Sequence, residues 1–326
     1  MHKSILYISK GETASSTRYR ALQYFPFLKK NDWTPSHITI SGGFGSIITS
    51  LIAAHHADVV VLLRKTFPMP IFWLLRKLSK KLIFDFDDAI FCNTDGSHSH
   101  TRMQRFKHTI KNCDYIFAGN GYLAAHAKQF NSAVEVIPTS VDTDKYNLDC
   151  QKDARALTLV WIGSSSTKKY LVDILPQLEK AAQSVPNLQL NNIADFQLSS
   201  PTLKIINIGW QAETEASELN KADIGIAPML DNNWTKGKCA LKVLQYMASG
   251  LPVISSHSGV NAEVIQDQVT GYLMEKNEDW PELIIALQHK KSLLQQMGLH
   301  GKLFVNNEFS IPAVYQKISA VLYRLN

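Results

Sequence analysis

Apolar and polar positions follow two rhythms along this chain. Short runs rich in Val, Ile, Leu and Phe, typical of buried strands, are separated by longer stretches whose apolar residues recur at helical spacing. Strands that alternate with helices in this way form parallel sheets. The predicted strands are residues 4–8, 37–40, 58–63, 82–86, 114–118 and 135–137 in the first half, and 157–162, 188–190, 204–207, 223–227, 252–255 and 271–274 in the second.

One polar stretch without a clear period, residues 142–156, interrupts this pattern and predicts a linker. The chain of 326 residues is long enough for two domains. We therefore expect two doubly wound, Rossmann-like α/β domains, residues 1–150 and the residues from 151 onward. Ligands of such sheets bind beyond the carboxyl ends of the strands, so the predicted site is a cleft between the domains.

The composition narrows the function classes. Hydrophobic residues make up 45% and charged residues 19% of the chain, which excludes a disordered protein. Its four cysteines are far apart, so neither a zinc site nor a disulfide framework is expected. Unpaired cysteines are typical of a reducing compartment, so we expect the protein in the cytoplasm. The first residues lack the apolar core of a signal peptide, and no run reaches the roughly 18 apolar residues of a membrane span.

The net charge of +6 comes from the first half alone. Residues 1–150 carry 18 Lys and Arg against 12 Asp and Glu, whereas the remaining residues carry 16 of each. A basic first half predicts an anionic partner such as lipid headgroups or a phosphorylated substrate. No nucleic acid is expected, because the chain has neither zinc-finger spacing nor a ribonucleoprotein motif.

The stretch 223–271 is the richest in candidate chemistry. A strand leads into a polar loop with Asp231 and Trp234, and then into a predicted helix from about 239 to 248. A helix start offers unpaired N–H groups to a phosphate, and Gly237 permits close approach of a ligand. Lys238 and Lys242, four residues apart, are expected on one helix face. The alternative is a solvated lysine pair at a helix start.

A second phosphate candidate follows the strand 157–162. Gly163 marks a turn, Ser164 and Ser165 offer hydroxyl and backbone donors, and Lys168 opens the next helix. Serine and threonine are also favoured as helix N-caps whatever the ligand, so the two interpretations stand side by side.

An ordered set of motifs runs through the chain, and together they resemble the retaining GT-B glycosyltransferases of family four (group 1), in particular a branch of bacterial surface-polysaccharide synthesis. The motifs are SSTRYRALQYFPFLKK, FDFDDAIF, IPTSVDTDKY, LVWIGSSSTKKYL, DIGIAPM, GKC, LQYMASGLPV and SGVNAEVIQDQVTG. The resemblance implies an acceptor domain (1–150) with a last helix (about 310–326) that crosses back to it, and a donor domain (151–309). It also implies a nucleoside-diphosphate sugar, foremost a UDP-sugar, as co-substrate, with no further cofactor.

Two positions depart from the pattern of that family. A pair of glutamates eight residues apart is replaced by Gly237 and Gln245, and an arginine after the first glycine by Ser164. Gln245 retains donors and acceptors for ribose hydroxyls, but Gly237 offers no side chain to the sugar. We infer that Lys238 and Lys242 supply the missing positive charge. The expected donor-binding set is Gly163, Ser164, Ser165, Lys168, Gly237, Lys238, Cys239, Lys242 and Gln245.

Three carboxylates close the strand 82–86. Asp85 and Asp87 are expected on one face and Asp88 on the other. They fit an Asp-x-Asp metal site, a cap on the next element, or, as the resemblance implies, a place near the meeting point of donor and acceptor sugars. The third interpretation makes Asp87 and Asp88 catalytic together with Lys238 and Lys242, with no metal.

Arginines follow two predicted strands in the first half. Arg18 and Arg20 come after the first strand and Arg64 after the third, where strand ends point toward the expected cleft. They are candidates for binding an anionic acceptor, and the alternative is an exposed arginine without a ligand.

The stretch 64–81 contains six basic residues and no acidic one. Ile71, Leu74, Leu75 and Leu78 form an apolar stripe that is expected to pack on the sheet. An anionic membrane surface is the partner considered for the other side, with Arg76, Lys77, Lys80 and Lys81 as cations and Phe67, Met69, Phe72 and Trp73 as residues that dip into the interface.

The sequence thus predicts a metal-independent hexosyltransferase that moves a sugar from a nucleoside diphosphate to a glycan or lipid-linked acceptor, with retention. It is expected in the cytoplasm or peripherally on the inner face of the membrane. A non-catalytic nucleotide-sugar-binding subunit and a nucleotide-sugar epimerase of the same fold are the alternatives.

Overall fold

The computed structural model describes residues 3–40, 43–152 and 155–325, and the chain divides into two compact units. Unit 1 comprises residues 1–140, 232–239 and 311–326, and unit 2 comprises 141–231 and 240–310, as far as they are described. The main division thus falls after residue 140, ten residues before the predicted boundary. The segment 232–239 belongs to unit 1, although the sequence assigned it to the donor domain.

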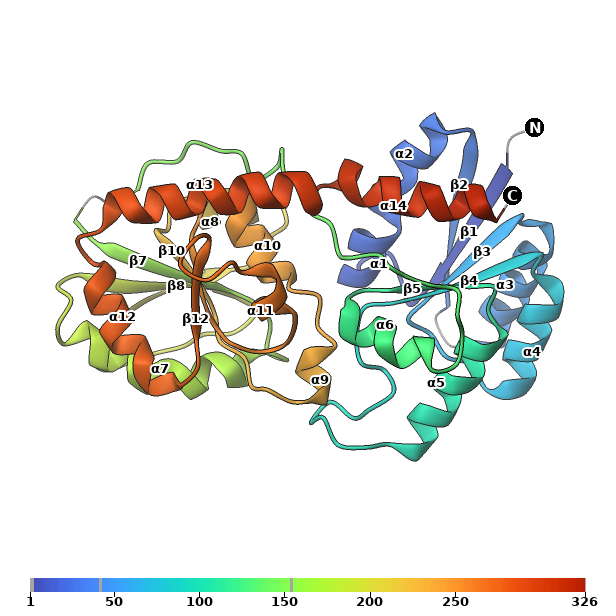
Figure 1. Ribbon diagram of the computed structural model, residues 1–326, viewed down its shortest axis with the longest axis horizontal. Coiled ribbons are helices and arrows are strands. Elements are labelled where there is room, and N and C mark those ends of the chain that lie inside the picture. The colour runs from blue at the N-terminus through green and yellow to red at the C-terminus, as the bar shows by residue number, and fades with distance from the viewer. Residues whose placement is uncertain (1–2, 41–42, 153–154, 326) are drawn as a thin grey trace. The chain divides into compact units, whose positions relative to one another are not determined.

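Unit 1 is built on a parallel sheet of six strands (Figure 1). The strand order is β2-β1-β3-β4-β5-β6. The chain therefore adds β2 on one side of β1, and then adds β3 to β6 in sequence on the other side. The strands are β1 (Lys3–Ser9), β2 (Trp33–Thr39), β3 (Val59–Leu63), β4 (Lys81–Phe86), β5 (Tyr115–Ala118) and β6 (Val134–Val136).

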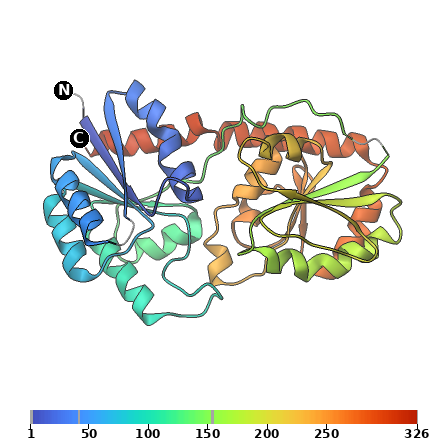
Figure 2. The ribbon, with the colours of Figure 1, turned by 180° about the vertical axis from the view of Figure 1, so that it is seen from behind.

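Two hydrophobic layers form the core of unit 1. Alternate strand residues face opposite sides, so Val60 and Leu62 enter one layer while Val59 and Val61 enter the other. One layer is covered by α3 (Phe44–His56), α4 (Met69–Leu78), α5 (His100–Asn112) and α6 (Gly121–Lys128). The other is covered by α1 (Ser15–Arg20), η1 (Leu22–Tyr24), α2 (Phe25–Lys30) and α14 (Ile311–Arg324) (Figure 2).

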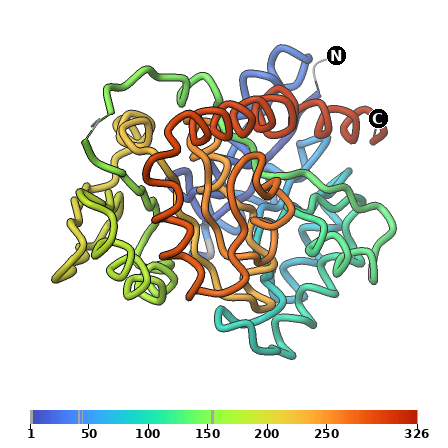
Figure 3. Tube along the Cα trace, turned by 60° about the vertical axis from the view of Figure 1, so that its left-hand side comes forward, coloured from blue at the N-terminus to red at the C-terminus, as the bar shows by residue number. Residues whose placement is uncertain are grey.

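Unit 2 repeats this plan with a second parallel sheet of six strands, in the order β12-β11-β10-β7-β8-β9. The path of the chain through it can be followed in Figure 3. The strands are β7 (Leu157–Ile162), β8 (Leu188–Ala194), β9 (Lys204–Gly209), β10 (Ile224–Ala227), β11 (Val253–Ser256) and β12 (Gly271–Met274).

Helices also cover both faces of this second sheet. One face carries α8 (Glu215–Asn220), α10 (Leu241–Ala248), α11 (Gly259–Val264) and part of α13 (Lys291–Glu308). The other carries α7 (Lys168–Ala182) and α12 (Trp280–Leu287), with η2 (Asn277–Asp279) before α12. The predicted fold class, two doubly wound α/β domains, is confirmed, and each of the twelve predicted strands overlaps an observed one.

The predicted linker is not a free connection. Within 142–152, Tyr146 is buried, and its hydroxyl donates to Glu215 at 2.5 Å inside unit 2. Residues 153–154 lie outside the described part of the chain. The polar composition of this stretch therefore reflects side-chain hydrogen bonding to unit 2 as well as exposure.

The prediction for the stretch 64–81 is wrong in detail. The buried residues of α4 are Phe72 and Leu75, and Phe67 before it is buried too, whereas Leu74 of the predicted inward stripe is 39% exposed. The helix is rotated relative to the prediction because Phe72 packs into the core beneath α4 and α5 and stacks edge-on against His108.

Candidate active site

A cluster of six charged side chains lies where β3 and β4 end in unit 1. Its members, here called the charge cluster, are Arg20, Arg64, Asp85, Asp87, Asp88 and Lys238. Three cations face three carboxylates, so the cluster is formally neutral. Arg64 has a left-handed backbone, with φ of 55°, and its N–H donates to the carbonyl of Asp85 at 2.7 Å. This turn directs the Arg64 side chain toward the carboxylates that follow β4.

The inner pair of the cluster is buried. Nε of Arg20 lies 2.5 Å from Oδ1 of Asp85, and both residues are 2% exposed. Burial raises the pKa of Asp85 to about 6, and the guanidinium of Arg20 opposes the rise. The side chain of Arg20 thus lies inside the protein and is bonded to Asp85 through Nε, and its contact with an acceptor stays a prediction.

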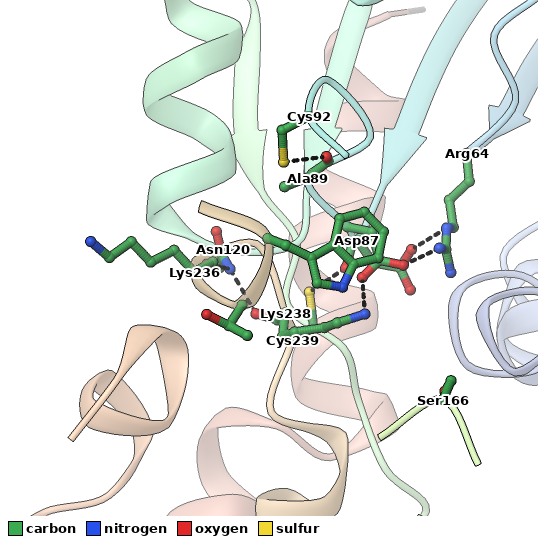
Figure 4. Close-up of polar contacts among 12 residues, drawn as sticks. Arg64, Asp87, Ala89, Cys92, Asn120, Ser166, Lys236, Lys238 and Cys239 are labelled. Carbon is green, nitrogen blue, oxygen red and sulfur yellow. Dashed lines mark hydrogen bonds and ion pairs between the residues drawn. The ribbon is translucent and has the colours of Figure 1, made fainter. Parts of the chain in front are cut away.

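The outer pair of carboxylates shares one cation. Nε of Arg64 lies 3.1 Å from Oδ1 of Asp87, and its Nη2 donates to Asp88 (Figure 4). Burial raises the pKa of Asp87, and the charge of Arg64 opposes this rise. Asp87 and Asp88 thus meet at one guanidinium, while Asp85 is turned to another. No group of metal ligands occurs among the residues that the structure describes.

The segment 232–239, which includes α9 (Asn233–Lys236), is fixed to unit 1 by an amide. Nδ2 of Asn120 donates to the carbonyls of Lys236 and Lys238 at 3.0 and 2.8 Å (Figure 4). The Oδ1 of Asn120 accepts from the N–H of Leu123 at the start of α6. Trp234 packs against the hydrophobic layer of unit 1. Asn120 is 3% exposed, so these bonds are shielded from water.

Gly237 and Cys239 have packing roles in this segment. A Cβ on Gly237 would lie 2.6 Å from the backbone N of Ala89, so this glycine accommodates unit 1 itself. The thiol of Cys239 donates to the carbonyl of Asp87 at 3.3 Å, and burial raises its pKa. A Cβ on Gly119 would lie 2.4 Å from that sulfur. Gly237 and Cys239 thus make contacts within unit 1, and their donor contacts stay a prediction.

Lys238 and Lys242 do not share a helix face, contrary to the prediction. Ala240 has a left-handed backbone, with φ of 51°, so α10 begins only at Leu241. Nζ of Lys238 lies 2.7 Å from Oδ1 of Asp88 and 4.5 Å from the Trp234 ring centroid, which places it in the charge cluster. Lys242 lies in α10 of unit 2.

Lys242 and the turn that follows β7 contact the same tryptophan ring. Nζ of Lys242 lies 4.4 Å from the ring centroid of buried Trp161, and a Cβ on Gly163 would lie 2.3 Å from the same ring. The first turn of α10 has no side-chain cap. Unit 2 thus contains a lysine, a glycine-containing turn and a helix start without a side-chain cap. Such features provide positive charge and N–H donors to a phosphate group.

The loop after β7 is partly occupied by its own hydrogen bonds. The hydroxyls of Ser164 and Ser166 lie 2.8 Å apart, and the N–H and hydroxyl of Ser165 both donate to Asp195, at 2.7 and 3.0 Å. Nζ of Lys168 lies 4.9 Å from the Phe196 ring centroid. Ser165 is therefore committed to a carboxylate, the Ser164 hydroxyl is bonded to Ser166, and Lys168 lies over the residue that follows Asp195.

Gln245 belongs to a buried network. Its Nε2 donates to the hydroxyl of Tyr146 at 3.0 Å, and that hydroxyl donates to Glu215. Glu215 also accepts from Lys145 at 3.1 Å and from the Trp210 indole at 2.7 Å. Gln245 would have to give up its bond to Tyr146 in order to donate this N–H to a ribose hydroxyl. The network supplies the hydrogen bonds of Glu215, a carboxylate that is almost fully buried.

Several of these residues were not among those predicted for the site. Asn120 and Asp195 each follow a strand, at Ala118 and Ala194, so their position after a carboxyl end was the available signal. Tyr146 and Glu215 had no such signal. Arg18, which was predicted, lies half-buried at the end of α1, with its guanidinium 5.5 Å from the Tyr19 ring centroid.

Comparison of the sequence with known proteins points to one family for part of the chain. Residues 150–290 match the family described as glycosyl transferases group 1. A stretch of 80 residues, 24% of the chain, is 32% identical to alpha-1,3/1,6-mannosyltransferase ALG2 of Rhizomucor pusillus and covers 18% of the length of that protein.

Solved structures resemble the chain over its whole length. HepE of Anabaena, solved with UDP and glucose, superposes with a TM-score of 0.73 at 12% identity, over 99% of this chain and 100% of that one. Sucrose-phosphate synthase of Thermosynechococcus elongatus gives a TM-score of 0.74 at 14% identity, over 99% of both chains. The chain therefore has the GT-B fold, and its residues 150–290 match the glycosyl transferases of group 1.

Proposed function

We propose that this protein is a glycosyltransferase that moves a sugar from a nucleoside diphosphate to a hydroxyl group of a glycan or lipid-linked acceptor. The observation that carries the proposal is that Lys242 lies over the same Trp161 ring that Gly163 contacts, inside the region that matches group 1 glycosyltransferases. A fixed cation at an uncapped helix start stabilises the charge that develops on a leaving diphosphate.

The donor is assigned to unit 2. Lys242, Gly163, Ser164 and Lys168 would contact the diphosphate, with Lys242 as its main counter-charge. UDP-sugars are the first donors to test, because HepE of the same fold was solved with UDP and with UDP-glucose. In this proposal Ser165 and Gln245 do not contact the donor themselves. Ser165 acts through its bond to Asp195, and Gln245 acts through its bond to Tyr146.

The acceptor is assigned to unit 1, with Asp87 and Asp88 as the groups that hold its hydroxyl. A carboxylate whose pKa is raised is a stronger hydrogen-bond acceptor than an ordinary one, and burial raises the pKa of Asp87, so Asp87 can orient the hydroxyl while the diphosphate takes its proton. Lys238 and Arg64 then position the two carboxylates. Arg20 contributes indirectly, through its ion pair with Asp85 at the end of the same strand.

The proposed reaction proceeds with retention and without a protein nucleophile. The acceptor hydroxyl attacks the anomeric carbon as the bond from that carbon to the diphosphate breaks, the proton of the hydroxyl passes to the departing diphosphate, and Lys242 stabilises the charge of that diphosphate. No divalent metal is needed in this scheme. Its support is that Asp85, Asp87 and Asp88 are each committed to an arginine or lysine within the charge cluster.

We assign the enzyme to cell-surface polysaccharide synthesis at the cytoplasmic face of a membrane, with a lipid-linked glycan as the acceptor. Support comes from the basic first half of the chain, whose excess of cations suits an anionic carrier lipid or membrane.

A non-catalytic nucleotide-sugar-binding subunit is the second candidate. Gly237 and Gln245 stand where the family resemblance places glutamates, Gly237 packs against Ala89, and Gln245 is bonded to Tyr146. Such a subunit would bind a nucleotide sugar without cleaving it. A nucleotide-sugar epimerase of the same fold would instead convert the donor into another free sugar or nucleotide sugar.

A screen of nucleoside-diphosphate sugars by thermal shift tests the proposal. We expect one donor class to raise the melting temperature by mass action, and the same donor to be hydrolysed slowly or transferred to an acceptor. Binding without release of the nucleotide would favour the binding subunit, and an epimerised product would favour the epimerase. The absence of a shift with every donor would contradict all three.

A further inference from the structure

Two neighbouring helices of unit 1 expose apolar side chains on their outer surface. Helices α3 and α4 lie side by side (Figures 1 and 2), and Ala54, Phe72 and Leu75 hold them to the core. Their outer residues are not covered by any described part of the chain: Ile52 is 58% exposed and Trp73 61% exposed. The α3–α4 face, as we call this surface, consists of Ile48, Ile52, Met69, Trp73 and Leu74, with Lys77 beside them.

A groove runs between the two helices. It has a volume of about 260 Å³, and its walls include Ile48 and Ile52 of α3 and Leu74 and Leu78 of α4. Single exposed apolar residues are common on soluble proteins, but a contiguous group on two adjacent helices marks a surface that binds a partner. Ile48, Ile52 and Leu74 line one groove and form such a group, and the exposed Met69 and Trp73 lie on the same helix as Leu74.

The charge of this region indicates what kind of partner fits. Neither α3 nor α4 contains an acidic residue, and α3 ends in His55 and His56. Nζ of Lys77 lies 5.1 Å from the Trp73 ring centroid, so a cation and an exposed indole are presented together. This combination suits the headgroup level of an anionic bilayer, where an indole has one apolar and one polar environment and a lysine meets lipid phosphates.

The structure also corrects which cations are available. Arg76 contacts Asp114 at 3.2 Å, and Lys80 lies 2.8 Å from Asp58, so both are partly neutralised by ion pairs. Phe67 and Phe72 are buried and cannot enter a membrane interface. The apolar part of the surface is instead extended by α3, which the pattern of residues 64–81 did not include.

We propose that the α3–α4 face binds the surface of a bilayer that contains anionic lipids, with Ile52, Met69 and Trp73 inserted at the headgroup boundary and Lys77 among the phosphates. No described helix is long and apolar enough to cross a membrane, so this binding is peripheral. It needs no donor or acceptor sugar, and its test is therefore independent of the transferase proposal. A second copy of the chain or a helical peptide is an alternative occupant of the groove.

The test is co-sedimentation of the full chain with vesicles of phosphatidylcholine alone or mixed equally with phosphatidylglycerol, at low and physiological salt. We expect binding to the mixed vesicles only, and a loss of at least about 10-fold in Ile52→Glu and Trp73→Glu. The matched control is Leu299→Glu, which changes a residue that is 56% exposed on α13 of unit 2 and should bind like the native chain.

Several results would overturn the proposal. They are native protein that stays in solution with the mixed vesicles, equal binding of the variants, and loss of binding in Leu299→Glu as large as in Trp73→Glu. A dimer in sedimentation equilibrium that dissociates in Trp73→Glu would assign the face to a second copy instead. Because both substituted residues are exposed, circular dichroism should show native folding, and Lys77→Glu supplies a further variant that leaves the apolar residues intact.

Discussion

Nζ of Lys238 lies 2.7 Å from Oδ1 of Asp88, so a lysine expected at the donor phosphates is paired with a carboxylate of unit 1. Asp88 is 6% exposed and accepts from Arg64 as well. Removing one partner of such a shielded pair leaves charge without compensation, which costs more than the loss of an exposed pair. The pairing supports the proposal that Lys238 positions Asp88, and its predicted contact with the diphosphate stays a prediction.

A double-mutant cycle tests this pairing. We expect Lys238→Met and Asp88→Asn each to destabilise the protein, and the double variant to lose less than the sum, with a coupling of about 1–3 kcal/mol in denaturant unfolding. Lys221 and Glu218, an exposed pair on unit 2 with Nζ and Oε1 2.6 Å apart, provide the matched control, where the coupling should stay near 0.3–0.5 kcal/mol. Additive effects at Lys238 and Asp88 would show that the pair is not maintained in solution.

Asp87→Asn should separate transfer from donor binding. The amide keeps the shape of the side chain but lacks the negative charge that orients the acceptor hydroxyl, so turnover should fall on the order of 100-fold. The dissociation constant for UDP, measured by calorimetry, should change less than about twofold, because Asp87 lies in unit 1 and the proposed diphosphate contacts lie in unit 2. Asp95→Asn, in an exposed turn of unit 1, is the control. Equal losses in turnover and UDP affinity would assign Asp87 to the donor instead.

Gly163→Ala should impair unit 2. The added Cβ would lie 2.3 Å from the Trp161 ring, on which Lys242 rests, so we expect a loss of about 1–3 kcal/mol in stability together with weaker UDP binding. Gly121→Ala, whose Cβ would meet no atom within 4 Å, should leave both unchanged. Native UDP affinity in Gly163→Ala would separate this loop from the donor site.

The fold was predictable from sequence for a simple physical reason. The central strands are buried on both faces, so runs such as Val59–Leu63 are apolar at every position and stand out from the amphipathic helices between them. The positions of the predicted strands along the chain show which residues follow the carboxyl end of a strand. This was enough to choose Arg64, Asp87 and Asp88 as candidate site residues. It did not give their pairing, because Arg64 follows β3 whereas Asp87 and Asp88 follow β4.

The position of Lys238 could not be predicted for the same kind of reason. The residues after Gly237 have a helical pattern, yet the helix starts only at Leu241, since the backbone at Ala240 is left-handed. The contact that fixes the preceding segment comes from Asn120, more than a hundred residues earlier in the chain. Likewise, the inward rotation of Phe72 depends on the space left beneath α4 and α5, which spacing along one helix does not reveal.

Removal of divalent metals should leave the reaction intact. In the proposed site Lys242 and the start of α10 supply positive potential for the diphosphate, and the three carboxylates of the charge cluster already face Arg20, Arg64 and Lys238. We expect turnover in saturating EDTA to stay within about twofold of the untreated enzyme. Loss of activity that magnesium or manganese restores would return Asp87 and Asp88 to the role of metal ligands.

The central claim is that Lys242 stabilises a leaving nucleoside diphosphate, and the turnover of Lys242→Ala tests it most directly. The assay follows UDP release from the donor selected by thermal shift, with Lys169→Ala, a lysine that is exposed at the start of α7, as the matched control. We predict that Lys242→Ala loses on the order of 100-fold in turnover with native folding, whereas Lys169→Ala retains it. Native turnover in folded Lys242→Ala would contradict the claim.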